Sequence, residues 1–224
     1  MRMRDTSESV TSKSPGPLMW PDPTQLSRNC ALAGYDRTHT FRVAWVGELP
    51  FGSGKRWAHE SPLAKAVLGG WQVNGIFSSY TGTPFTVSAS GTSLNAAGQS
   101  QTADQVKATV EKIGAVGRNT PFYDPAAFSP VTRIGYGNTG RKILRGPGLV
   151  NIDAALFRNF ALRERWKLQF RAEAFNVTNT PHFGNPSASV STPSSFMTIT
   201  SASSSSNNVE GGERVFRFAL RASF

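Results

Sequence analysis

The sequence is poor in the residues that build disulfides, metal sites and membrane-spanning helices. It has one cysteine, Cys30, so no disulfide can form within the chain. The histidines, His39, His59 and His182, are far apart and none has a second ligand at metal spacing, so we expect no metal and no cofactor. No stretch approaches the ~20 consecutive apolar residues that a membrane-spanning helix needs, which excludes helical insertion.

The scattered histidines also leave no common catalytic arrangement. A nucleophile, a base and an orienting group cannot be assembled from them, so we expect no enzyme activity. Asp153 and Glu173 could be imagined as an acid and base pair. A charge-balanced network with Arg171 is the simpler interpretation, because all three residues alternate with apolar neighbours.

A strict alternation of apolar and polar residues is present at the carboxy terminus. Phe216, Phe218, Leu220 and Phe224 fall on one face, while Arg217, Arg221 and Ser223 fall on the other. This period of two predicts a strand with one apolar and one polar side. It is typical of an outer-membrane β-barrel, in which apolar side chains contact lipid and polar ones face the lumen.

Four other segments share this design. From Trp166 to Ala174, for example, one set of alternate positions is wholly apolar and the other carries Lys167, Arg171 and Glu173. We therefore predict an all-β chain that forms part of an antiparallel transmembrane barrel with about five spanning strands. The predicted strands lie near residues 38–49, 70–80, 149–160, 166–177 and 213–224.

The charges within these strands suggest an aqueous lumen instead of a nucleic-acid surface. The net charge of +10 is compatible with binding nucleic acid, but a nucleic-acid platform needs its cations on one exposed face with accessible aromatic residues between them. Here many cations alternate with apolar residues, so we expect no nucleic-acid partner. We predict that the lumen-facing charges are Arg42, Asp153, Lys167, Arg171, Glu173, Arg217 and Arg221.

Three segments between the strands are rich in loop-forming residues. They are residues 1–37, 81–148 and 178–212. We expect residues 1–37 to be an extracellular loop or a disordered segment, and residues 81–148 to contain a weak helical patch near 106–113. Barrels of this kind have long loops outside the cell and short periplasmic turns. We therefore place these loops outside, and we expect Ala161–Arg165 to join the strands on either side of it as an antiparallel hairpin.

Five strands do not suffice to close a barrel, since the smallest barrels have eight. Residues 1–14 are polar throughout and lack the apolar core and cleavage site of a secretion signal. We therefore expect the chain to be the carboxy-terminal part of a larger protein that resides in the cell outer membrane.

Four short motifs lie in or next to the predicted strands. They are Glu48-Leu-Pro-Phe-Gly-Ser-Gly-Lys-Arg-Trp57, Leu68-Gly-Gly-Trp-Gln-Val-Asn-Gly75, Leu144-Arg-Gly-Pro-Gly148 and Gln169-Phe-Arg-Ala-Glu-Ala-Phe-Asn176. These motifs resemble the barrel of TonB-dependent-receptor-like proteins of the Oar type. The resemblance implies a large barrel with an internal plug, and TonB would act only through upstream regions that this sequence lacks. It implies no ligand-binding residue, because none of these motifs is a binding motif.

A soluble β-sandwich or surface-adhesion module is the alternative. It would bury the apolar faces against a second sheet and would place turns every 8 to 12 residues, whereas this chain has long loops. In the barrel interpretation the partners are outer-membrane lipid, the remainder of the barrel with its plug, and the barrel-assembly machinery. Similarity to related barrels implies that this machinery recognises the terminal strand through Phe216, Phe218, Leu220 and Phe224.

Overall fold

The structure, a computed structural model, divides into two compact units. The sheet unit comprises Thr40–Tyr80, Leu149–His182 and Ala202–Phe224, and the loop unit comprises Met1–His39, Thr81–Gly148 and Phe183–Ser201. The residues described are 23–51, 55–57, 63, 67–94, 100–163, 166–202 and 212–223.

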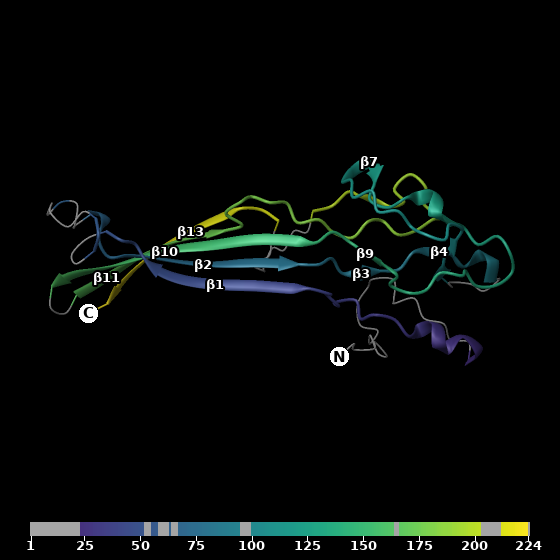
Figure 1. Ribbon diagram of the computed structural model, residues 1–224, viewed down its shortest axis with the longest axis horizontal. Helices are drawn as coiled ribbons and strands as arrows, with labels where there is room; N and C mark the ends of the chain where they lie inside the picture. Colours follow the sequence, from purple (N-terminus) through teal and green to yellow (C-terminus); the bar gives the residue numbers. More distant parts are fainter. Residues whose placement is uncertain are drawn as a thin grey trace. The chain divides into compact units, whose positions relative to one another are not determined.

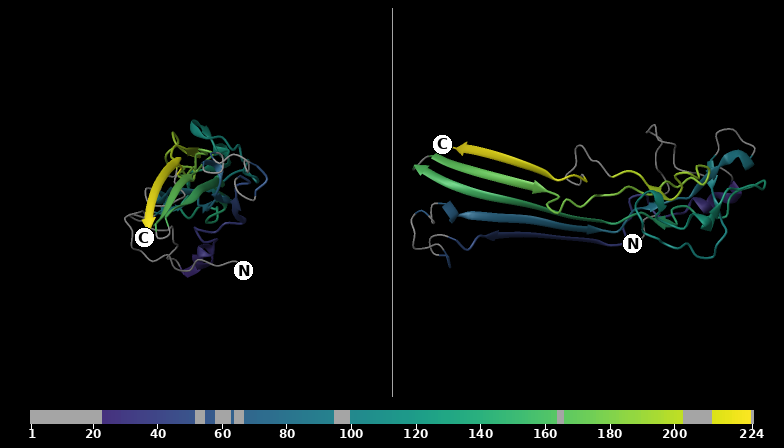
Figure 2. Two further views of the ribbon diagram at one scale, coloured as in Figure 1. Left: turned by 90° about the vertical axis from the view of Figure 1, so that its left-hand side faces the viewer. Right: turned by 90° about the horizontal axis from the view of Figure 1, so that it is seen from above.

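The sheet unit is built around a five-stranded antiparallel sheet (Figures 1 and 2). Its order is β1-β2-β10-β11-β13, so each strand pairs with the strands that precede and follow it in the sheet unit. The predicted all-β, antiparallel architecture is therefore confirmed. The strands are β1 (Thr40–Glu48), β2 (Trp71–Tyr80), β10 (Leu149–Arg163), β11 (Trp166–Phe175) and β13 (Val215–Ser223).

The strands β10 and β11 form the predicted antiparallel hairpin, and β13 pairs with β11 on its other side. The predicted link Ala161–Arg165 is wrong in length, because β10 continues to Arg163 and β11 begins at Trp166. The register shifts between Ala161 and Arg163, which marks a bulge where the paired strands approach their turn. A bulge adds a residue out of phase, so the period of two could not locate this strand end.

The two ends of the sheet carry different connections. At one end Thr40, Tyr80 and Leu149 are register partners across three strands, and Phe175 pairs with Val215. The long connections 81–148 and 176–214 leave from and return to this end. At the other end Glu48 pairs with Gln72, and the β10–β11 turn is short.

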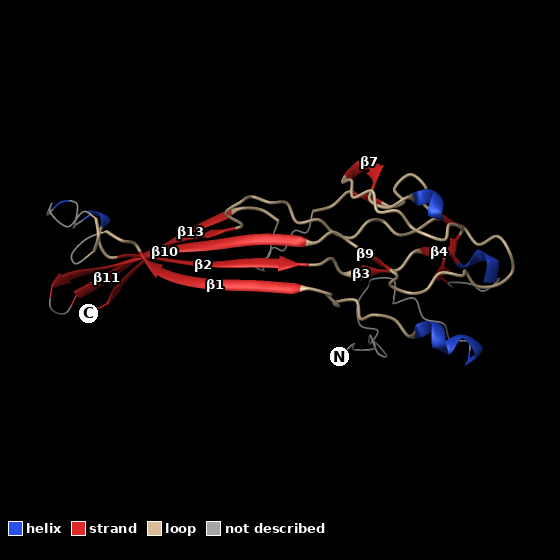
Figure 3. Ribbon diagram, viewed as in Figure 1, coloured by secondary structure: helices blue, strands red, loops and turns tan. Residues whose placement is uncertain are grey.

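The loop unit contains short strands and 3₁₀ helices, shown in Figure 3. The strands form two-stranded antiparallel sheets, β3 with β9, β4 with β5, β6 with β8 and β7 with β12. The 3₁₀ helices are η1 (Pro23–Asn29), η2 (Gly91–Leu94) and η3 (Pro125–Ala127). The strands are β3 (Pro84–Phe85), β4 (Ser88–Ser90), β5 (Ser100–Thr102), β6 (Asp104–Gln105), β7 (Gly117–Pro121), β8 (Phe128–Ser129), β9 (Leu144–Arg145) and β12 (Thr198–Ile199).

These segments are more ordered than the sequence predicted. Parts of 81–148 and 183–201 pack together around a hydrophobic core that includes Val87, Met197 and Ile199. The expected helical patch near 106–113 is wrong, since this stretch has no helix and pairs through Lys112 with Tyr123. No helix among the described residues is long and apolar enough to cross a membrane.

Candidate functional site: the two faces of the five-stranded sheet

Strand register decides which side chains share a face of the sheet. In an antiparallel sheet, residues directly opposite each other on neighbouring strands point to the same side, and successive residues alternate. Arg42 lies opposite Ser78, which lies opposite Asn151, so these residues share a face. We call the face that carries Arg42 the polar face and the face that carries Phe41 the apolar face.

The polar face collects charged side chains from four of the five strands, β1, β10, β11 and β13. Continuing from Asn151, Ala155 lies opposite Glu173, and Glu173 lies opposite Arg217. The sequence alone could not show that separate strands bring their charged sides together, because this depends on register. The charged residues predicted to face a lumen all lie on the polar face, namely Arg42, Asp153, Lys167, Arg171, Glu173, Arg217 and Arg221.

Aromatic residues on the polar face hold several of these arginines. The guanidinium carbon of Arg171 lies 4.6 Å from the ring centre of Phe157, which is its direct partner on β10. The guanidinium carbon of Arg217 lies 4.8 Å from the ring centre of Phe175, its diagonal neighbour on β11. Such cation–π contacts restrain the arginines over neighbouring strands. Phe157 interrupts the polar pattern of its own strand, so this role appears only once the register is known.

Asp153 is held by one hydrogen bond from its own strand and one from the residue that follows the neighbouring strand β11. Its Oδ1 accepts from the Asn151 side-chain amide and from the backbone N–H of Asn176, each at 2.9 Å. Glu173 lies 3.4 Å from Arg171, two residues earlier on the same strand. The carboxylates therefore belong to a polar network, in agreement with the simpler interpretation of Asp153 and Glu173.

Asn176 directly follows β11 and has a left-handed backbone conformation, which the hydrogen bonds of its side chain stabilise. Its φ of 49° is left-handed, which asparagine tolerates better than most residues. The side chain accepts from the Thr180 backbone N–H at 3.0 Å and donates to the Thr180 carbonyl at 2.9 Å. These bonds fix the turn after β11, a role that the sequence patterns did not indicate.

The apolar face exposes large side chains. Phe41 is 58% exposed and Phe218 is 70% exposed, although both belong to regular strands, each paired along its length with one neighbouring strand. Phe216, Phe218 and Leu220 of the predicted assembly signal lie together on this face. Phe224, the last residue of that signal, lies outside the described residues.

On the apolar face, aromatic side chains pack against residues of other strands. The rings of Trp71 and Phe170 meet edge to face with their centres 5.9 Å apart. The Trp45 ring lies over Gly75, where an added Cβ would come within 2.0 Å of the ring. Glycine is thus required at position 75 because the indole occupies the space of a side chain.

Arg158 is the charged exception on the apolar face. It is 9% exposed and donates to the Val67 carbonyl at 2.5 Å. Its guanidinium carbon lies 4.4 Å from the ring centre of Phe160 and 5.4 Å from that of Trp71. Aromatic rings and a carbonyl therefore surround the charge near one end of the sheet, which reduces the cost of placing it on this face.

The sheet unit buries polar side chains where a soluble domain buries apolar ones. Among the described residues, the buried hydrophobic side chains all belong to the loop unit, whereas the buried side chains of the sheet unit are polar or charged. In the sheet unit the latter are Ser78, Asn151, Arg158, Asn176 and His182. Such a sheet needs an apolar surrounding for its apolar face.

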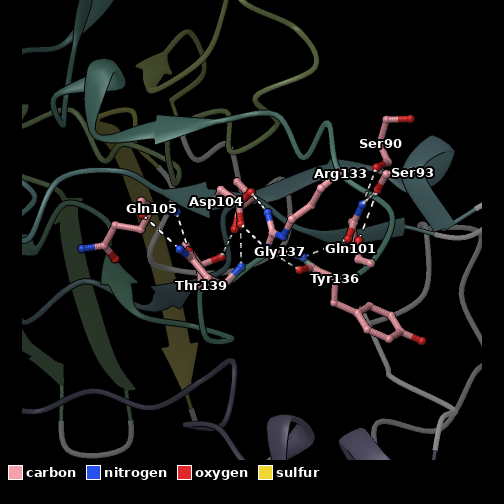
Figure 4. Close-up of polar contacts among 12 residues, drawn as sticks. Ser90, Ser93, Gln101, Asp104, Gln105, Arg133, Tyr136, Gly137 and Thr139 are labelled. Carbon is pink, nitrogen blue, oxygen red and sulfur yellow. Dashed lines mark hydrogen bonds and ion pairs between the residues drawn. The ribbon is translucent and has the colours of Figure 1, made fainter.

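The loop unit has a polar network of its own, drawn in Figure 4. The buried Gln101 donates to the Ser90 carbonyl at 3.1 Å and accepts from the Gly137 backbone N–H at 3.0 Å. Asp104 accepts from Arg133 at 3.1 Å and from the Asn138 N–H at 2.9 Å. The hydrogen bond from Arg133 is the main cause that lowers the pKa of Asp104. The bonds from Arg133, Gly137 and Asn138 hold segment 133–139 against β5 and β6, and the bond to Ser90 joins β5 to β4. These bonds have a structural role.

The described residues offer no metal centre, since they contain no cluster of three or more His, Cys, Asp and Glu side chains that could hold an ion. The geometry instead suits a wall between two environments, one apolar and one aqueous.

Comparison with known families identifies this wall. Residues 2–217 match the family described as the outer membrane beta barrel domain. The chain belongs to this family. An outer membrane beta barrel places its apolar side chains toward lipid, which accounts for the exposed aromatic residues of the sheet. No curated protein and no solved structure matches the chain.

Proposed function

We propose that the chain contributes barrel wall and extracellular loops to a large outer-membrane receptor or transporter of the TonB-dependent type. The observation that supports this most strongly is the register, which brings the apolar sides of β1, β2, β10, β11 and β13 onto one face and, apart from Arg158, the described charges of these strands onto the other. In this role the apolar face contacts outer-membrane lipid, and the polar face lines an aqueous lumen that holds a plug.

The connections support the same orientation. The connections 81–148 and 176–214 meet one end of the sheet, and the shorter connections 49–70 and 164–165 meet the other, as in barrels whose extracellular loops are longer than their periplasmic turns. Among the described residues, β1 and β13 each pair on one side only. In lipid an unpaired strand edge is costly, so we propose that further strands of a larger barrel pair there.

The terminal strand is the proposed contact for the barrel-assembly machinery. An amphipathic strand with an open edge can be captured by strand addition, in which backbone hydrogen bonds give affinity and alternate side chains set register. The exposed Phe216, Phe218 and Leu220 suit this recognition. The role is structural and not enzymatic, and TonB would act through other regions of the parent protein.

Cysteine labelling in intact cells tests the lipid contact. Val43 and Ala44 are adjacent on β1, both are exposed, and they lie on opposite faces. In a Cys30→Ser background, a water-soluble maleimide should label Ala44→Cys and spare Val43→Cys, because lipid covers only the apolar face. Equal labelling of both would contradict a lipid-facing wall, and protection of Val43→Cys without membrane association would favour a soluble sandwich.

The receptor type needs a separate test. We expect the genomic reading frame around this sequence to encode a plug domain and a TonB-binding segment upstream. A frame without either would overturn the receptor assignment and leave the outer membrane beta barrel unaffected.

A further inference from the structure

In one part of the polar face, the residues that the structure describes include cations and no acid. Near the end of the sheet with short connections, Asn159, Gln169 and Arg221 are register partners across β10, β11 and β13. In the next row Lys167 lies opposite Ser223. Lys167 and Arg221 are thus diagonal neighbours on adjacent strands, about 7–8 Å apart at their Cα atoms.

These side chains line one hollow. Asn159, Lys167, Gln169, Arg221 and Ser223 border it together with Phe160. Among the described residues, neither the Lys167 side chain nor the Arg221 side chain forms an ion pair, a hydrogen bond or a ring contact. Elsewhere on the same face, by contrast, Arg171 has Glu173 and Phe157, and Arg217 has Phe175.

Two cations in such a position repel each other unless an anion lies between them. Neighbouring like charges on a sheet are destabilising, and no carboxylate lines this hollow. Long lysine and arginine side chains can converge on a shared ligand across the diagonal. An arginine fork and a lysine ammonium are the donors that proteins most often present to phosphate.

The uncharged residues complete the donor set. The Gln169 amide already donates to Asn159 Oδ1 at 3.1 Å, which directs the Asn159 amide nitrogen and the second Gln169 hydrogen to other acceptors. Ser223 adds a hydroxyl. The side chains of Asn159, Gln169 and Ser223 can each donate a hydrogen bond. A tetrahedral oxyanion has several oxygens that accept such bonds.

We propose that Lys167 and Arg221, assisted by Asn159, Gln169 and Ser223, form a binding site for the phosphate group of a soluble solute. Rings of Arg and Lys are how anion and phosphate pores attract their ligands, so the site would favour anionic solutes at this end of the lumen. The proposal rests on the proposed function only in taking the polar face to be aqueous.

Chemical protection in the unaltered protein tests the site. The protein in outer-membrane vesicles is treated with an amine-acylating reagent with and without inorganic phosphate, and modification of each lysine is measured by mass spectrometry. Phosphate should slow acylation of Lys167 about tenfold at saturation, consistent with charge-assisted hydrogen bonds. Lys107, which is paired with Asp124, is the internal control and should change little. Equal rates for Lys167 with and without phosphate would overturn the site.

A charge variant adds an independent measurement. Arg221→Gln should abolish phosphate protection of Lys167, whereas Arg217→Gln, on the same face of the same strand but outside the hollow, should retain it. Loss of protection in both variants would show diffuse charge and contradict a site. Anionic phospholipid vesicles added in place of phosphate should give no protection, and protection by them would assign the site to a lipid headgroup and overturn the soluble ligand.

The two proposals fail separately. Equal maleimide labelling of Val43→Cys and Ala44→Cys contradicts the lipid-facing wall, whatever phosphate does. Correct labelling without phosphate protection of Lys167 contradicts the phosphate site alone.

Discussion

The loop unit and the sheet unit solve the same problem, the placement of apolar side chains, in opposite ways. The loop unit buries Phe122, Met197 and other apolar residues in a core, as any water-soluble domain does. The sheet unit leaves Phe41 and Phe218 exposed on a regular sheet and buries polar groups such as Asn151. The contrast shows that one chain is built for two solvents, water around the loop unit and lipid against one face of the sheet.

The largest expected effect is in the core of the loop unit. Replacing Phe122, which is 4% exposed, by alanine should cost about 3–5 kcal/mol of local unfolding free energy, because a cavity remains where the ring was. Hydrogen exchange of amides in 100–145 measures the loss in the intact protein. Ile134→Ala, at a side chain that is 95% exposed, should change exchange by less than about 0.5 kcal/mol. Similar effects from both changes would mean that the loop unit has no specific core.

The next largest effect tests the contact of the sheet's apolar face with lipid. Phe170 lies mid-strand on the apolar face, so Phe170→Arg should cost about 2–4 kcal/mol in bilayers, since the charge must enter lipid. Ala155→Arg is the matched change on the polar face, opposite Glu173, and should cost less. The readout is equilibrium unfolding of the protein in lipid bilayers. A sheet that tolerates arginine equally on both faces would remove the distinction between them.

A smaller effect concerns packing along the apolar face. Gly75→Ala should destabilise the sheet by about 1–3 kcal/mol, because the added methyl group must displace the Trp45 ring. Gly47→Ala is a suitable control, since no atom lies within 4 Å of its added Cβ. Both variants can be compared by unfolding in the same bilayers. A neutral Gly75→Ala would show that Trp45 does not lie over the glycine.

The smallest expected effect is a dependence of the loop unit's stability on pH. The Arg133 hydrogen bond lowers the pKa of Asp104 in the folded loop unit, so the carboxylate stabilises the fold above its unfolded pKa. This contribution should be lost as pH falls from the unfolded pKa of about 4 through the lowered folded value. Exchange of the 133–139 amides should therefore rise below about pH 4, and Asp104→Asn should flatten that rise. An unchanged pH profile in Asp104→Asn would exclude this contribution.

The sheet unit was largely predictable from sequence, because period-two alternation is a local signal. It located β11 and β13 to within a few residues and sorted Lys167 and Arg171 from Leu168 and Phe170. The bulge near Ala161 escaped it, because a bulge breaks the period.

The loop unit was not predictable in this way. Its strands are two to five residues long and pair across large distances in sequence, as β7 does with β12. No period develops over such lengths, so the residues were interpreted as loops. The contacts of Arg171 with Phe157 and the hollow beside Lys167 were also inaccessible, because both arise from the register between strands and not from any one strand.

A spin-label scan along β13 tests the central claim most directly. Single cysteines at positions 215–223, in a Cys30→Ser background, are labelled, and their accessibility to lipid-soluble oxygen and to a water-soluble nickel complex is measured in outer-membrane vesicles. The two-faced sheet predicts oxygen maxima at Phe216, Phe218 and Leu220 and nickel maxima at Arg217, Ala219 and Arg221, in antiphase with a period of two. Uniform access by the nickel complex, or a period near 3.6, would contradict a strand with one face in lipid and the other in water.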